Sequence, residues 1–98
     1  MELAEIRNIV LDAMRSTNLA REPADQLDVS ALAPVFGPGR RLDSIGLVAL
    51  LIDIEEALAS RGVNVTLSDA RAVSRSRSPF RDVPSLVQHI SDVVSRGV

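Results

Sequence analysis

The feature that most constrains the fold is a long apolar run that starts near residue 42 and continues past residue 54. A stretch rich in proline and glycine precedes it, and Gly62 follows as a C-terminal stop. On a helix at about 100° per residue, apolar side chains then gather on one face. This face comprises Leu47, Leu51, Ile54 and Leu58, flanked by Leu50 and Ala57. The run therefore predicts a central helix over residues 44–60 with this face in the core.

The same helix carries a second stripe on roughly the opposite side. Its members repeat the same spacing: Ile45, Ala49, Ile52 and Glu56. A surface helix of a small domain needs only one apolar face, so the second stripe requires a partner. We expect Ile45 and Ile52 to be apolar contacts for a partner protein, with Asp53 and Glu56 meeting its basic residues. The alternative is that later segments of this chain cover Ile45 and Ile52.

Two polar residues, Asp43 and Ser44, open this helix. Both are good capping residues, because a side-chain oxygen can accept a hydrogen bond from an otherwise unpaired backbone N–H. A phosphate ester on the Ser44 hydroxyl would also be favoured at the positive end of the helix dipole, by about 0.3–1 kcal/mol when exposed. Arg40 and Arg41 come just before, either as solvated loop charges or as contacts for an anionic group or partner.

The residues around Ser44 resemble the acyl carrier protein family. The similar segment reads Leu42-Asp43-Ser44-Ile45-Gly46-Leu47-Val48, followed by Leu50 and by Ile54-Glu55-Glu56. In that family an Asp-Ser-Leu motif opens the second helix, and its serine carries a 4′-phosphopantetheine arm. This chain has Asp-Ser-Ile instead. The resemblance extends through residues 65–69, 78–83 and 86–90, which look like the third helix and the start of the last one. It covers about residues 36–90.

The resemblance implies that a phosphopantetheinyl transferase attaches the arm from coenzyme A to Ser44, beside Asp43. The partners it implies are acyl- or aminoacyl-loading enzymes and acyl-transfer or condensing enzymes. Carriers of fatty-acid synthesis usually have acids where Gly46 and Ala49 stand here. This departure favours a specialised pathway, such as polyketide or nonribosomal-peptide synthesis. A D-alanine-type aminoacyl carrier and a carrier-like interaction module that is never modified stay open as alternatives.

The rest of the chain predicts an all-α, four-helix acyl-carrier-like bundle in one domain over residues 1–98, with three main helices and one short helix. Helical spacing of Leu3, Ile6, Val10 and Ala13 indicates a first helix over residues 2–16. A long first loop follows, pinned by the apolar residues Leu27, Val29, Leu32, Val35 and Phe36. Residues 63–67 alternate like a strand but have no pairing strand, so we expect an extended connector. Ser68 or Asp69 begins the short helix, which ends near Ser74. Asp82 caps the last helix, with Pro84 in its first turn.

Composition excludes several functional classes. The 98 residues include no cysteine and one histidine, His89, which excludes thiolate catalysis and a metal site rich in Cys or His. The formal net charge of −2 does not favour nucleic-acid binding. Ser44 has only His89 as a base, on a different predicted helix, so we expect no enzyme. His89 lies off the apolar stripe of its helix, so we expect it at the surface. No signal peptide or membrane-spanning run is apparent, and we expect a cytoplasmic monomer.

Overall fold

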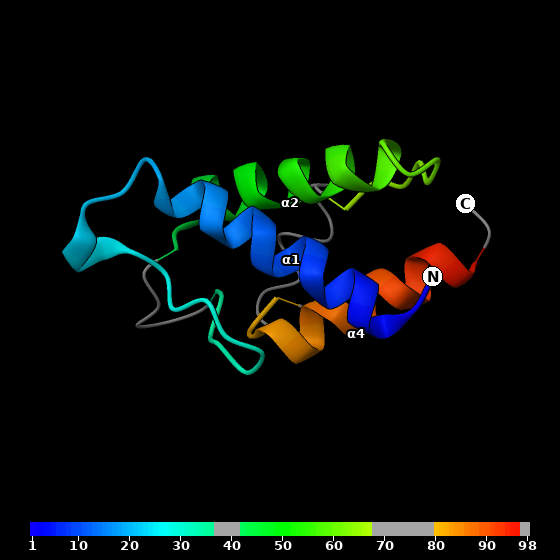
Figure 1. Cartoon of the computed structure of the whole chain (residues 1–98), viewed down its shortest axis with the longest axis horizontal. Helices are drawn as coiled ribbons and strands as arrows, with labels where there is room; N and C mark the ends of the chain where they lie inside the picture. Colours follow the sequence, from blue (N-terminus) through cyan, green and yellow to red (C-terminus); the bar gives the residue numbers. More distant parts are fainter. Residues whose placement is uncertain (37–41, 68–79, 97–98) are drawn as a thin grey trace.

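The computed structural model describes residues 1–36, 42–67 and 80–96 (Figure 1). These ranges contain helices α1 (Leu3–Asn18), α2 (Ser44–Ala59) and α4 (Val83–Ser95), together with a single 3-10 turn, η1 (Pro23–Asp25). Within these ranges the chain forms isolated β-bridges but no strand. The all-α class predicted from the sequence is therefore confirmed. The short helix predicted between residues 68 and 74 lies outside the described residues.

Helix α1 packs against both other long helices, and Figure 1 shows it lying against α2 (green) and α4 (orange to red). It extends two residues further than the sequence predicts, to Asn18. Its core face is formed by Ile6, Ile9, Val10, Ala13 and Met14. Leu3, which the spacing placed on this face, is 46% exposed because it stands in the first turn, at the edge of the bundle. Among the described residues, the buried apolar side chains are aliphatic apart from those of Met14 and Phe80, which are both fully buried.

Helix α2 places its two faces as the periodicity predicts. The buried face consists of Leu47, Leu50, Leu51, Ile54 and Leu58, and Ala57 is partly buried at its edge. The helix ends in a Schellman motif, in which Gly62 donates to the carbonyl of Ala59 at 3.0 Å and Val63 donates to that of Leu58 at 3.0 Å. Gly62 adopts φ +83°, a left-handed conformation that other residues rarely adopt. The predicted stop at Gly62 is thus confirmed.

The first loop is pinned by a slightly different set of residues from the predicted one. Leu27 and Val35 are buried, and Val29 and Phe36 are partly buried, as expected. The prediction was wrong for Leu32, which is 80% exposed. Leu32 lies inside a turn closed by the hydrogen bond from the Ala33 N–H to the Ser30 carbonyl, at 3.1 Å, which turns its side chain toward solvent. Ala33, at 1% exposed, packs into the core instead.

A short antiparallel pairing joins the first loop to the start of α4. We call this pairing the loop clip, and it comprises residues 33–36 and 80–83. Its three backbone hydrogen bonds run from Val35 N to Arg81 O (2.9 Å), from Phe36 N to Phe80 O (3.0 Å) and from Val83 N to Ala33 O (2.9 Å). The clip joins the end of the first loop to the segment that begins α4.

Asp82 caps α4 as predicted, accepting a hydrogen bond from the Ser85 N–H at 2.9 Å. Partial burial acts to raise the pKa of Asp82. The hydrogen bonds from Ser85, together with the neighbouring Arg81 guanidinium, outweigh that effect and hold the pKa below its ordinary value of 3.8.

This cap should make stability depend on pH. Because the pKa is lower in the folded state, the stabilisation by Asp82 is complete above the unfolded pKa, near about 4, and is lost as pH falls through the folded pKa. Asp82→Ala should lower the free energy of unfolding by about 0.5–2 kcal/mol at neutral pH. Denaturant titrations of both proteins at several pH values should show the difference shrinking in acid. A difference that is constant down to the lowest pH would contradict this account, and Asp28→Ala, at an exposed loop acid, is the control.

Candidate functional site

The start of α2 is built by Asp43. Its backbone is extended, with φ −87° and ψ −179°, and its carboxylate accepts a hydrogen bond from the Gly46 N–H at 2.7 Å. Its carbonyl accepts the first intrahelical bond, from the Leu47 N–H at 2.9 Å. Asp43 is therefore the N-cap. The sequence left Asp43 and Ser44 as equal candidates for this role.

Ser44 is consequently the first residue of the helix, and it is exposed. Ser44 therefore lies at the N-terminal, positive end of the α2 dipole, which stabilises anions. The first turn of α2 after the cap contains no acidic residue. The Asp43 carboxylate is next to Ser44 in the sequence, and its Oδ1 is engaged by the Gly46 N–H. The residues present therefore fit a phosphate ester on Ser44.

The second stripe of α2 lies at the surface. Ile45 is 80% exposed and Ile52 is 41% exposed, and Ala49, Asp53 and Glu56 are exposed as well. Two large apolar side chains thus stand in solvent on one helix, next to carboxylates toward its C-terminal half. A docking role for these residues requires this exposure, and the role itself stays a prediction.

Leu42 connects this site to the rest of the fold. It forms an isolated bridge with Phe36 and is only 2% exposed. Phe36 in turn belongs to the loop clip, so the residue before Asp43 is held by packing and by backbone pairing. Arg40 and Arg41, predicted as contacts for an anionic group or partner, lie outside the described residues.

Glu55 and Glu56 diverge, as their adjacent positions on a helix require. The Glu55 carboxylate accepts a hydrogen bond from the Leu67 N–H, which fastens the end of the extended connector to α2. Leu67 is fully buried, and Val63 and Val65 are partly buried. Glu56 stays exposed. Sequence reasoning missed the role of Glu55, because nothing local relates it to a residue twelve positions away.

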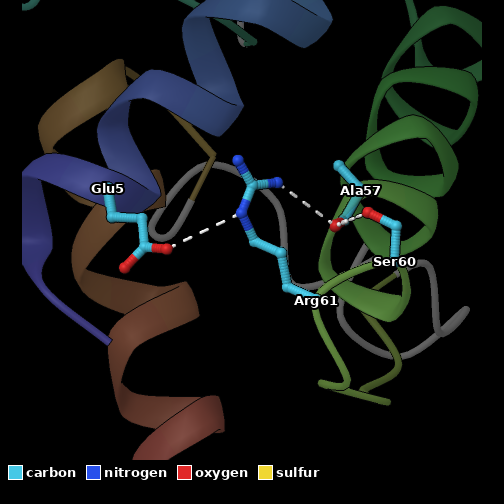
Figure 2. A network of polar contacts seen from close by, with 4 residues as sticks. All are labelled: Glu5, Ala57, Ser60 and Arg61. Atoms are coloured by element: carbon cyan, nitrogen blue, oxygen red, sulfur yellow. Dashed lines mark hydrogen bonds and ion pairs between the residues drawn. The ribbon is translucent and has the colours of Figure 1, made fainter.

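The opposite end of α2 is braced against α1 (Figure 2). The Arg61 side chain lies between the two helices, with its Nε 3.6 Å from Oε2 of Glu5 and its Nη1 3.5 Å from the Ala57 carbonyl. The Ser60 hydroxyl donates to the same carbonyl at 2.7 Å. The Arg61 and Glu5 side chains are about half exposed, so the ion pair contributes no more than about 1 kcal/mol. We interpret this end as structural.

His89 is half-buried rather than the simple surface residue that the sequence predicted. Its ring packs edge-to-face against Phe80, with centroids 5.7 Å apart and planes at 87°. The prediction was wrong because Phe80 lies outside α4, on the clip segment, and the helical stripe of α4 does not include it.

The described ranges, residues 1–36, 42–67 and 80–96, contain neither a cluster of metal-binding side chains nor a membrane-spanning helix. No group of three or more His, Cys, Asp or Glu residues there is placed to hold a metal ion. None of the helices in those ranges is long and apolar enough to cross a membrane. Comparisons of the chain with protein-family models, curated proteins and solved structures find no match.

Proposed function

We propose that this protein is an acyl carrier that holds acyl groups as thioesters on a 4′-phosphopantetheine arm attached to Ser44. The observation that carries the proposal is the exposed Ser44 at the first position of a helix capped by Asp43. The Asp-Ser-Ile motif and the apolar helix behind it support the same interpretation. The chain would then present its cargo to biosynthetic enzymes without itself catalysing a reaction.

The chemistry of the chain is consistent with an added arm. It contains no cysteine, so it has no thiol of its own for a thioester. The arm, when bound, supplies that thiol. Ser44 would hold its phosphate at the helix N-terminus, and tethering would raise the effective concentration of the cargo at each partner enzyme. The fourth, short helix that the sequence predicts between residues 68 and 74 belongs to this proposal.

The surface of α2 favours a specialised pathway over housekeeping fatty-acid synthesis. The first half of the helix has no acidic residue, and its exposed positions are apolar at Ile45 and Ala49. Acids appear only from Asp53 onward. A partner would therefore meet apolar contacts close to the arm and negative charge further along, unlike a partner of the fatty-acid carriers, which usually have acids at the positions of Gly46 and Ala49.

Mass spectrometry of the intact protein tests the proposal directly. Incubation with coenzyme A and a broad-specificity phosphopantetheinyl transferase should add the mass of one phosphopantetheinyl group. A protein that gains no mass would instead be a helical interaction module with the same core. If the arm is attached, the arm-bearing protein can be incubated with acyl-loading and with D-alanine-loading enzymes. The enzyme that transfers its group to the arm distinguishes an acyl from an aminoacyl carrier.

Docking on the second stripe gives a separate prediction. Ile52→Ala should change the free energy of unfolding little, because the side chain is already 41% exposed. It should nevertheless weaken association with a loading or transfer enzyme by about 1–2 kcal/mol, which is a typical result of truncating an interface contact. Steady-state kinetics of the partner enzyme, with the carrier as the varied substrate, measure this loss.

Two further variants sharpen the docking test. Glu56→Arg should weaken association in the same direction and in a salt-dependent way, because charges at an interface rim mainly change the rate of encounter. Leu32→Ala truncates an equally apolar, 80% exposed side chain on the first loop and should leave the kinetics unchanged. An Ile52 variant that unfolds easily, yet shows normal kinetics with the partner enzyme whenever it is folded, would show that Ile52 belongs to the core.

A further inference from the structure

We propose that a groove beside the C-terminal half of α2 binds the free end of the arm on Ser44, and that it favours a short acyl cargo that ends in an amine. This inference rests on the proposed modification of Ser44. It goes beyond that proposal by naming where the cargo binds on the free carrier and which chemical class the cargo belongs to.

The groove lies between α2 and the extended connector and has a volume of about 350 Å³. It is lined by Glu55, Glu56, Ala59, Asn64, Val65 and Thr66. The connector that forms its second wall is fastened at both ends. The Val63 N–H donates to the Leu58 carbonyl at 3.0 Å, and the Leu67 N–H donates to the Glu55 carboxylate. Both walls are therefore held in place by the fold itself.

Helical geometry places this groove in line with Ser44. Glu55 follows Ser44 by eleven residues, which is about 16 Å along the axis and within about 20° of the same direction around it. Val48 and Ile52 lie between them on the same flank, where Val48 is half-buried and Ile52 is 41% exposed. A group attached to Ser44 can extend along this flank without crossing the buried face.

The arm is long enough to reach the groove. Bonds in an extended chain advance about 1.1–1.2 Å each, so an arm of about fourteen bonds spans roughly 16 Å from the serine oxygen to its sulfur. The sulfur then lies level with Glu55. A group joined to it continues toward Ala59, where α2 ends, so the groove has room for a short cargo only.

The charges of the groove favour an amine. Glu56 is exposed, and its carboxylate makes no hydrogen bond or ion pair with any residue that the structure describes. Glu55 adds a second carboxylate, and no basic residue is among the described residues of the lining. A terminal ammonium group would be stabilised by this negative charge, whereas a hydrocarbon end would desolvate the carboxylates without compensation.

The remaining lining fits the uncharged part of such a group. Ala59 and Val65 supply methyl groups for contact with cargo methylenes. Asn64 and Thr66 are exposed, and their amide and hydroxyl groups can exchange hydrogen bonds with the amides of the arm.

A matched pair of cargoes tests the proposal. The β-alanyl and butyryl groups have the same chain length, and only the first ends in an amine. The transferase can attach each to Ser44 from the corresponding acyl-coenzyme A, and intact mass confirms loading. In the β-alanyl form, NMR should show nuclear Overhauser contacts from the cargo methylenes to the methyl groups of Ala59 and Val65. In the butyryl form they should be about threefold weaker, a population change typical of one exposed ion pair.

Two variants identify the group that selects the amine. Glu56→Gln keeps the shape of the side chain and removes its charge, so it should make the two cargoes alike. Glu22→Gln changes an exposed loop acid outside the groove and should preserve the difference. Equal contacts for both cargoes in the wild type would overturn the preference for an amine, and a difference that survives Glu56→Gln would overturn the role of Glu56. Absence of contacts from either cargo would overturn the groove as the binding site.

A chemically attached arm separates this inference from the proposed function. The chain has no cysteine, so Ser44→Cys introduces a single thiol. This thiol can be alkylated with reagents of the arm's length that end in an amine or in a methyl group. If the transferase adds nothing to the wild type, the proposed function fails, while the two labelled proteins still show whether a tethered amine occupies the groove. Contacts that are absent, or equal for the two labels, would overturn the inference.

Discussion

Leu51→Ala should lower the free energy of unfolding by about 2–5 kcal/mol, a large share of the stability of a domain of this size. Leu51 is fully buried: it lies in the middle of the core face of α2, with 0% of its surface exposed to solvent. Truncation removes apolar contact and leaves a cavity, because helices α1 and α2 are already packed together and relax only in part.

Chemical denaturation measures this loss, and the next residue provides a matched control. Ile52→Ala truncates a branched aliphatic side chain one position away, on the exposed side of the same helix, so it should cost much less. A loss within about 0.5 kcal/mol for Leu51→Ala would mean that the helical phase deduced from the sequence is wrong. Comparable losses for the two variants would mean that both faces of α2 are covered in solution.

The features that the sequence predicted correctly are local. The two faces of α2 follow from a period of 3.6 residues, and the stop at Gly62 follows from its tolerance of positive φ. The cap at Asp82 follows from the short reach of a carboxylate to the N–H three residues on. In each case the determining interaction lies within one or two helical turns, where sequence spacing is also spatial spacing.

The features that the sequence missed depend on distant segments. The loop clip joins residues 33–36 to residues 80–83, and it includes Ala33, which is buried where the sequence predicted Leu32. Asn18 fastens Leu27 through two hydrogen bonds, of 2.7 and 3.0 Å. Backbone pairing outside regular strands has no periodicity, so no pattern in the sequence could indicate it.

The candidate site falls between these two cases. Its placement at a helix start was predictable, because capping is local. The support of the cap by Leu42 was not, since Leu42 is bridged to Phe36, which the clip pairs with Phe80. The pathway is harder still, because partner choice depends on a surface that matches an unidentified enzyme.

Ser44→Ala should abolish the addition of the phosphopantetheinyl group, the largest functional effect expected for any single substitution in this chain. The reason is chemical: the alanine side chain has no oxygen to which the phosphate can be joined. The helix should persist, because the N-cap is the Asp43 carboxylate bonded to Gly46 and does not involve the serine hydroxyl. Intact mass measures the modification, and circular dichroism measures the helix content.

The other end of α2 supplies the control for this substitution. Ser60 is also an exposed serine at a helix terminus, with its hydroxyl donating to the Ala57 carbonyl at 2.7 Å. It lies at the negative end of the helix dipole, where a phosphate is disfavoured. Ser60→Ala should therefore be modified as fully as the wild type. Mass gain that survives Ser44→Ala, or a modified peptide that maps to another serine, would refute the assignment of Ser44 and with it the orientation of the docking stripe relative to the arm.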